Sequence, residues 1–143
     1  MKISAVAACF ALAGCATFPG LNMKSQNISY VAQEINPDEM EDVAIDMAEF
    51  LAMQLPAAKT TIELEQSKTV FHEMLHDELK DKGFAVTETG QDQDAVPVRY
   101  VVTSLDNGVL LRVKYRGHVV SRFYSRKDGQ LFAGGIAVRE AEK

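Results

Sequence analysis

The spacing of hydrophobic residues divides the chain into an apolar start, an irregular segment and a region of regular periodicity. Two stretches repeat every three or four residues, which predicts two amphipathic helices. Their stripes are Met40, Val43, Ala44, Met47, Phe50, Leu51 and Leu55, then Val70, Phe71, Met74, Leu75 and Leu79. Asn36 and Pro37 suit the start of the first helix, and Pro56 stops it. Ser67 can cap the second helix, which ends at Gly83.

Between and after these helices the period changes to two, which predicts strands. Short strands are expected at residues 60–65 and 84–88. Asn107-Gly108 between two apolar runs is typical of a hairpin with a type I′ turn. The resulting pairs are Ser104 with Leu111, Val102 with Val113 and Tyr100 with Tyr115.

The chain then returns through a loop around Gly117, with Leu111 opposite Phe123, and a last strand is expected at Ile136 to Val138. Helices and antiparallel strands in this order predict an α+β fold. In it, two amphipathic helices pack on one face of a mostly antiparallel sheet of about five strands, which follows a lipidated flexible tether.

The first fourteen residues have the features of a bacterial export signal. Lys2 precedes an apolar run from Ile3 to Leu12, about half the ~20 residues that a membrane span needs. Leu12-Ala13-Gly14-Cys15, at the end of this run, resembles the lipobox of bacterial lipoproteins. The resemblance implies cleavage between Gly14 and Cys15 and a lipid on the Cys15 thiol, a covalent group rather than a cofactor. The alternative is an ordinary secretory peptide with an incidental cysteine.

A lipid-bearing Cys15 divides the chain into three parts: a signal peptide at 1–14, a tether at 15–35 and a periplasmic domain at 36–143. Ala16 after the cysteine, by the sorting rules of such lipoproteins, favours the outer membrane with the domain facing the periplasm. In the tether, Ile28, Tyr30, Val31 and Ile35 are more apolar than a pure spacer requires. They suggest docking on a partner, although a loosely packed linker is an equal alternative.

Charge is distributed unevenly along the chain. Residues 34–94 hold sixteen acidic and four basic side chains, whereas residues 95–127 hold seven basic and one acidic. Such asymmetry indicates either an oriented surface or an electrostatic match between two parts of the molecule. With Cys9 removed and Cys15 lipidated, no disulfide is expected in the mature chain.

His72-Glu73-Met74-Leu75-His76 spells the HExxH motif of zinc peptidases. In that reading His72 and His76 bind zinc and Glu73 activates water. Against it, only one strand is expected before the helix, and His118 is too distant to be the downstream ligand. The apolar stripe also points both histidines away from the core. We therefore expect neither a catalytic residue nor a metal site, and keep a zinc hydrolase as the alternative.

The predicted hairpins place cationic and apolar side chains together on the sheet face away from the helices. This combination suits protein docking, whereas nucleic acid would need more stacking aromatics. The predicted docking residues are Arg99, Val101, Leu105, Leu110, Arg112, Lys114, Arg122 and Tyr124. The alternative is that the C-terminal strand or tail simply covers this face.

From the lipobox onward the chain resembles the TrbH family of conjugal-transfer lipoproteins. The matching segments are Leu12 to Cys15, Val43 to Ala48, Thr61 to Leu64, Leu79 to Val86, Pro97 to Val102 and Val109 to Val113. Neither the HExxH motif nor the tail after Asp128 belongs to the resemblance.

The resemblance implies a non-enzymatic subunit of the outer-membrane core of a type IV secretion apparatus, active in mating-pair formation. It implies VirB9-like and VirB10-like periplasmic partners in a ring hetero-oligomer, besides the lipid of the outer membrane, and no direct contact with nucleic acid. Only Cys15 takes a functional role from it. A stand-alone envelope lipoprotein that binds a small ligand is a further alternative.

Overall fold

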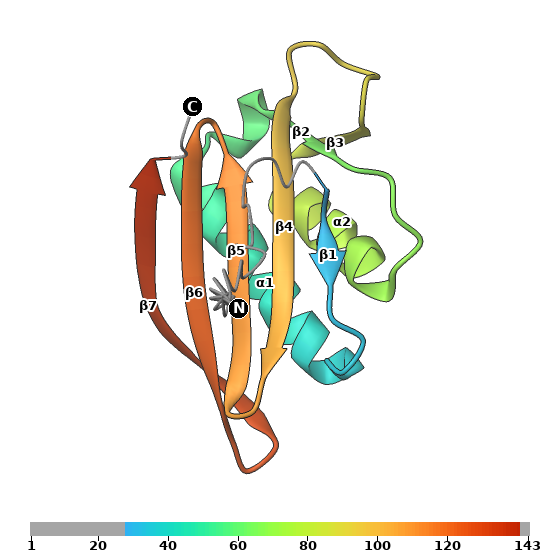
Figure 1. Ribbon diagram of the computed structural model, residues 1–143. Helices are drawn as coiled ribbons and strands as arrows, with labels where there is room; N and C mark the ends of the chain where they lie inside the picture. The colour runs from blue at the N-terminus through green and yellow to red at the C-terminus, as the bar shows by residue number, and fades with distance from the viewer. Residues whose placement is uncertain (1–27, 141–143) are drawn as a thin grey trace, which may run out of the picture.

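A computed structural model describes residues 28–140, which fold into two layers (Figure 1). Helices α1 and α2 lie on one face of a seven-stranded sheet. In chain order the elements are β1 (Tyr30–Val31), α1 (Pro37–Gln54), a short 3-10 turn (Ala57–Lys59), β2 (Thr61–Leu64), α2 (Val70–Asp81), β3 (Ala85–Glu88), β4 (Val96–Leu105), β5 (Gly108–Tyr115), β6 (His118–Lys127) and β7 (Gln130–Glu140). The predicted α+β class is confirmed, with more strands than the expected five.

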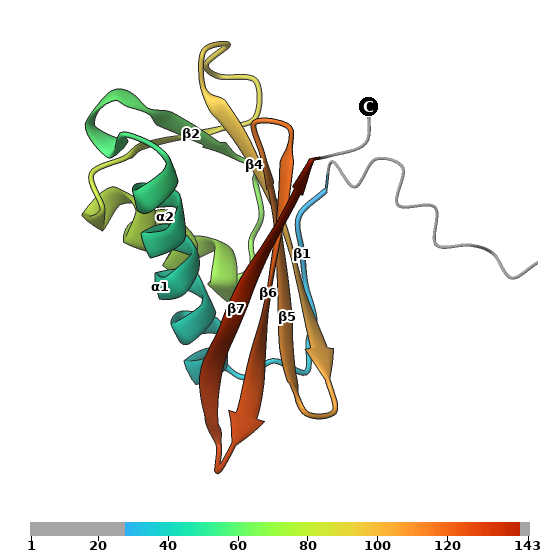
Figure 2. The same cartoon turned by 90° about the vertical axis from the view of Figure 1, so that its left-hand side faces the viewer.

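The strand order is β3-β2-β4-β5-β6-β7, and β1 pairs with β4. Strands β4 to β7 are antiparallel neighbours, as the hairpin signals predicted. The pairs that involve β1, β2 and β3 are parallel. The crossover between the parallel strands β2 and β3 carries α2, which places that helix on the sheet face. Figure 2 shows both helices on one side and the other side free of helices.

Helix α1 begins where the sequence predicted. The Asn36 side chain accepts a hydrogen bond from the Glu39 backbone N–H (2.9 Å), and the Glu39 carboxylate accepts one from the Asn36 N–H (3.4 Å). This reciprocal pair satisfies two donors that a helix start would otherwise leave without partners. Helix α2 is capped by Thr69, two residues after the expected Ser67.

The core lies between the helices and the sheet. Apolar side chains from the stripes of both helices meet the inward residues of β2, β4 and β5. Phe71 of α2 packs on Tyr100 of β4 with ring centroids 5.0 Å apart, and burial raises the pKa of Tyr100 to about 12. Val70, predicted as part of the α2 stripe, is 52% exposed at the first turn of the helix. None of the helices in residues 28–140 is both long and apolar enough to cross a bilayer.

The folded domain begins before the predicted boundary at residue 36. Tyr30 and Val31 pair with Val101 and Val102 as strand β1, and Ile35 is 2% exposed within the core. Residues 29–35, which the prediction assigned to the tether, therefore belong to the folded domain, because β1 pairs with β4 and Ile35 lies in the core. The signal peptide, Gly14, Cys15 and the rest of the tether lie outside the described residues.

Two hairpin details also differ from prediction. The β4–β5 loop is Asp106-Asn107, so Val102 lies opposite Leu111 and not Val113. A shift of two residues preserves the sheet face of every side chain, so the predicted inward face holds. The last strand is far longer than Ile136 to Val138, since β7 pairs along β6 from Gln130 to Glu140 with an irregularity near Gly134 and Gly135.

Candidate functional site

The sheet face without helices is the candidate docking surface. Alternation along β4 and β5 buries Tyr100, Val102 and Leu111 toward the helices and turns their neighbours to the opposite face. Six of the predicted docking residues lie there: Arg99, Val101, Leu105, Leu110, Arg112 and Lys114. The structure thus brings these six together on one face, in two neighbouring strands.

Arg122 and Tyr124 do not belong to this surface, and their predicted placement is wrong. Leu111 lies opposite Arg122, not opposite Phe123. A one-residue difference in register turns every side chain of β6 to the other face. Its cause is the tight two-residue turn at Arg116 (φ 44°) and Gly117 (φ 75°), where the prediction had a longer loop.

On the helix side, Arg122 and Tyr124 bind a carboxylate of α1. Arg122 Nη1 donates to both oxygens of Asp46, at 2.6 and 2.8 Å, and the Tyr124 hydroxyl donates to Asp46 at 2.5 Å. Burial, together with the hydrogen bond to Asp46, raises the pKa of Tyr124, because ionisation would place two negative charges side by side. This cluster joins β6 to α1 and is structural.

A second arginine of β6 forms a similar link. Arg126 Nε donates to the Glu39 carboxylate at 2.6 Å and Arg126 Nη2 at 3.2 Å. Glu39, which also completes the cap of α1, is 4% exposed. The hydrogen bond from Arg126 lowers the pKa of Glu39 against the opposing effect of burial. Residue spacing alone gave no signal for this pair, since its members are 87 positions apart.

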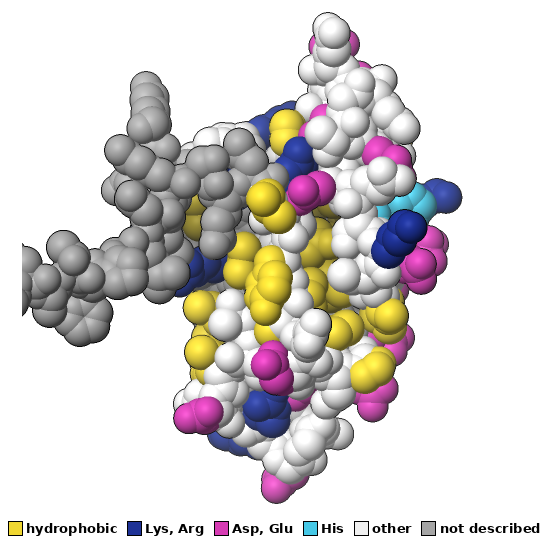
Figure 3. Space-filling view, turned by 45° about the vertical axis from the view of Figure 1, so that its right-hand side comes forward, with side chains coloured by type: hydrophobic (Ala, Val, Ile, Leu, Met, Phe, Trp, Pro, Cys, Tyr) yellow, Lys and Arg dark blue, Asp and Glu magenta, His cyan; other side chains and the backbone are white. Residues whose placement is uncertain are grey.

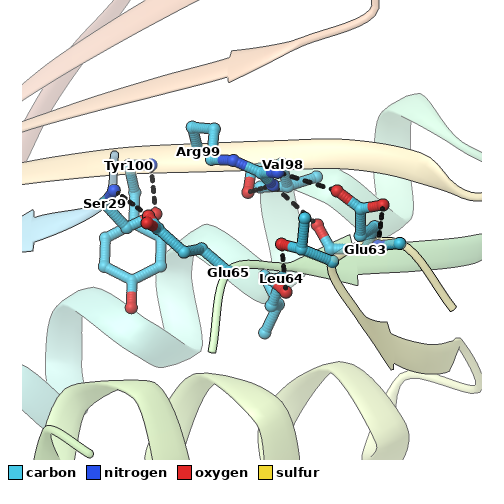
Figure 4. Close-up of polar contacts among 9 residues, drawn as sticks. Ser29, Glu63, Leu64, Glu65, Val98, Arg99 and Tyr100 are labelled. Carbon is cyan, nitrogen blue, oxygen red and sulfur yellow. Dashed lines mark hydrogen bonds and ion pairs between the residues drawn. The ribbon is translucent and has the colours of Figure 1, made fainter. Parts of the chain in front are cut away.

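Within the docking surface, Arg99 is held by Glu63 of β2 (Figure 4). Arg99 Nη2 donates to the Glu63 carboxylate at 2.7 Å, and Nη1 donates to the Glu63 backbone carbonyl at 3.3 Å. The hydrogen bond from Arg99 lowers the pKa of Glu63. The Arg99 side chain is 13% exposed. Arg99 therefore fixes β2 to β4 and is a poor candidate for direct contact with a partner.

The same close-up shows how the chain before β1 is fixed to the sheet. The Ser29 N–H donates to the Glu65 carboxylate at 2.6 Å, and the Tyr100 N–H donates to the Ser29 hydroxyl at 3.3 Å. These bonds place Tyr30, which is 55% exposed, beside Val101 on the docking surface. The sequence analysis had named Tyr30 as a residue of the tether that could dock on a partner, but not its pairing with β4.

The docking surface also includes two apolar residues, Val119 and Phe123, that the predicted register of β6 had placed on the opposite face. Both lie on β6 opposite outward residues of β5, Val119 opposite Lys114 and Phe123 opposite Leu110. The Phe123 ring covers Gly108, where an added Cβ would lie 2.7 Å from the ring. Figure 3 shows hydrophobic side chains gathered in the middle of the visible surface, with acidic side chains both next to them and toward its border. The surface therefore has an apolar centre with Arg112 and Lys114 among its members.

The HExxH helix has a different geometry from the predicted one. His72 is buried, at 9% exposed, so its expected outward direction is wrong. Its Nδ1 has no hydrogen-bond partner among the described residues, and burial lowers the pKa of His72. His76 is half-exposed, and its Nδ1 lies 3.2 Å from the Asp77 carboxylate. Within residues 28–140 no group of three or more His, Cys, Asp or Glu side chains is placed to hold a metal ion.

Comparison with known families identifies the relatives of this fold. The family described as conjugal transfer protein TrbH matches residues 22–141, which include all of the residues that the structure describes. The chain belongs to the TrbH family. The description of TrbH assigns it to conjugal transfer and names no catalytic activity. No match to this TrbH chain was found among curated proteins or among solved structures.

Proposed function

We propose that this TrbH chain is an outer-membrane lipoprotein of a conjugative type IV secretion apparatus and serves there as a non-enzymatic scaffold. The observation that carries the proposal is the family match over residues 22–141, which begins seven residues after the last residue of the lipobox-like Leu12-Ala13-Gly14-Cys15. Three acyl chains on Cys15 would anchor the protein firmly, since each buried methylene contributes about 0.8 kcal/mol. The domain would then face the periplasm.

The proposed partners are VirB9-like and VirB10-like ring proteins, bound through the docking surface. Its apolar centre favours burial, and Arg112 and Lys114 favour orientation toward an acidic partner. Tyr30 is the strongest candidate for a contact that dominates binding, because exposed tyrosines at an apolar patch are common hot spots.

The anchor is tested by Cys15→Ser in the natural host. The variant should fold as the wild type does but leave the outer-membrane fraction, because no thiol remains for the lipid. Far-ultraviolet circular dichroism of the purified variant controls for folding. Retention of Cys15→Ser in the outer membrane would contradict the proposal.

The scaffold role is tested by purifying the C-terminally tagged full chain in mild detergent from its host. Ring proteins in fixed ratio should accompany it, and bound zinc should be negligible. A solitary protein with one zinc per chain would instead support a hydrolase centred on His72, Glu73 and His76.

The docking surface is tested by Tyr30→Thr, which keeps a residue suited to a strand and removes the exposed ring. Recovery of ring proteins should fall by about tenfold or more, the size expected for a hot spot of ~2 kcal/mol. Met53→Thr is the matched control, because Met53 is 71% exposed on α1, in the helix layer. Equal losses from both variants would show that binding does not use the docking surface.

A further inference from the structure

Strand β7 forms an open edge of the sheet. It pairs with β6 along one side only, and in the part of the chain that the structure describes no strand lies beyond it. All of its eleven residues except Leu131 are exposed. Figure 2, which faces this side of the molecule, shows β7 as the outermost strand over its full length. Its outer edge therefore carries backbone donors and acceptors that a further strand could use.

Apart from the irregularity near Gly134 and Gly135, this edge lacks the features by which monomeric proteins prevent strand pairing. Such edges are usually short, or carry lysine, proline or charges that point inward. The edge strands β1 and β3 are short, with two and four residues. In contrast, β7 contains neither lysine nor proline, and its charges are Arg139 and Glu140 at the end.

On the helix side of β7, two apolar side chains are only partly covered by α1 or not covered at all. Ile136 lies opposite Arg122 and Val138 opposite Val120, so both point to the helix side of the sheet. Ile136 is 39% and Val138 59% exposed. The end of β7 thus presents an unpaired backbone edge and, beside it, an exposed apolar pair.

We propose that β7 pairs with β7 of a second copy of this chain, antiparallel, about a two-fold axis at Ala137. The pattern of the strand is self-complementary in this register. Ile136 of each copy lies opposite Val138 of the other, which makes one apolar strip of four side chains. Arg139 lies opposite Gly135, and Glu140 opposite Gly134, so no like charges meet.

Neighbouring registers are less favourable. Pairing must shift in steps of two to keep the apolar residues on the helix side. Such a shift moves the axis by one residue. An axis at Val138 would place Ile136 opposite Glu140, and an axis at Ile136 would place Val138 opposite Gly134, so both break the pairing of Ile136 with Val138. The axis at Ala137 makes a symmetric interface in which both copies use the same surface. It also leaves the docking surface accessible in each copy.

Disulfide cross-linking of the full chain tests the register directly. Cys9 and Cys15 are first changed to Ser, so that an introduced thiol is the only one and pairing is measured without the lipid. Ala137→Cys should give a covalent dimer on mild oxidation, because residues opposite each other across the axis lie about 4.5–5.5 Å apart. Failure of the lipoprotein proposal would leave this result unchanged.

Ser121→Cys is the matched control. Ser121 lies opposite Ala137 on β6, one strand inward on the same face. Across the proposed dimer two Ser121 residues are separated by three strand spacings, roughly 14 Å, beyond the ~7 Å limit for a disulfide. Equal cross-linking at the two positions, or none at Ala137, would overturn the proposal.

A second variant tests the pairing without cysteine. Ala137→Lys places two ammonium groups opposite each other, so the mass measured by light scattering at about 100 μM should fall from dimer to monomer. Gln130→Lys adds the same charge to β7 about 24 Å from the axis, at ~3.4 Å per residue, and should remain dimeric. A wild-type chain that is monomeric under these conditions would also overturn the proposal.

Discussion

Asp46 shows how much one side chain contributes to the assembly of this domain. It receives both Arg122 and Tyr124, and the side chains of Asp46 and Arg122 are 24% and 22% exposed. The Asp46 carboxylate neutralises the Arg122 cation, whose Nε also donates to the Gly134 carbonyl, and accepts the hydrogen bond of the buried Tyr124 hydroxyl. Its role was not readable from the sequence, because Asp46 occupies an ordinary polar position of an amphipathic helix.

Asp46→Ala should lower the free energy of unfolding by about 2–4 kcal/mol. The reason is that removing one partner of a largely buried ion pair leaves the other without compensation. Urea denaturation measures the change as a lower midpoint with an unchanged slope.

The matched control for Asp46→Ala is Glu49→Ala on the same helix. Glu49 pairs with Lys82 at 3.2 Å, but its side chain is 55% exposed. Such surface pairs contribute at most about 1 kcal/mol. If the two variants lost equal free energy of unfolding, the cluster around Asp46 would contribute no more to stability than a surface ion pair does.

At the scale of elements, strand register decides which surface the protein presents. Period-two patterns located β4, β5 and β6, because alternation is a local property. Register depends on turn geometry, and both turns were assigned wrongly. Asn107 and Gly108 do not have the positive φ expected of a type I′ turn, whereas Arg116 and Gly117 do have positive φ.

Gly108 is required for a reason other than turn geometry. A Cβ at this position would lie 2.0 Å from the Tyr124 carbonyl oxygen and 2.7 Å from the Phe123 ring. Gly108→Ala should therefore force β5 and β6 apart and cost about 1–3 kcal/mol, the range for overpacking. Thermal unfolding monitored by circular dichroism would show the lower midpoint.

Gly135→Ala provides the contrast within the same sheet. An added Cβ there meets nothing within 4 Å, so alanine should stabilise the strand by about 0.5–1 kcal/mol. A loss at Gly135 as large as that at Gly108 would contradict the packing explanation.

The sequence predicted the two helices, the layer arrangement and the sheet face on which six of the eight proposed docking residues lie. All of these follow from local periodicity and from caps such as Asn36. It could not predict the sheet face to which the side chains of β6 point, the length of β7 or the pairing of Tyr30 with β4. Each of these depends on contacts between distant segments, such as Tyr30 with Val101.

At the scale of the whole molecule, the acidic segment and the basic segment of the chain form ion pairs with each other in the folded domain. Three ion pairs connect an acidic residue before position 64 with an arginine after position 98: Glu39–Arg126, Asp46–Arg122 and Glu63–Arg99. They join the helix layer and β2 to the antiparallel strands. The basic segment thus serves the fold, with Arg112 and Lys114 placed on the docking surface.

These pairs predict the response of the domain to acid. Arg126 and Arg99 lower the pKa values of Glu39 and Glu63 in the folded state. Their stabilising effect is therefore complete above the unfolded pKa of about 4.3 and is lost as the pH falls through the lowered folded values. Urea midpoints measured between pH 7 and pH 3 should decline steeply below pH 5.

The double variant Glu39→Gln, Glu63→Gln should be less stable at pH 7 and decline less steeply in acid. Glu41→Gln with Asp38→Asn is the matched control, since both residues are exposed on α1. An unchanged acid profile in the first variant would show that other groups govern acid unfolding.

The attachment of β1 to the sheet also limits the distance between the domain and the membrane, and it determines which end of the domain points away from the membrane. If Cys15 carries the lipid, thirteen residues separate it from Ser29, a reach of at most about 50 Å at ~3.6 Å per residue. β1 runs parallel to β4 with Tyr30 opposite Val101, so the chain enters beside the middle of β4 and runs toward the β4–β5 hairpin tip. Val101 is four residues before Leu105, the last residue of β4, which puts the β4–β5 tip roughly 14 Å beyond this entry at ~3.4 Å per residue. The domain would hang close beneath the bilayer with its hairpin tips outermost, and ring proteins would have to approach the membrane to meet it.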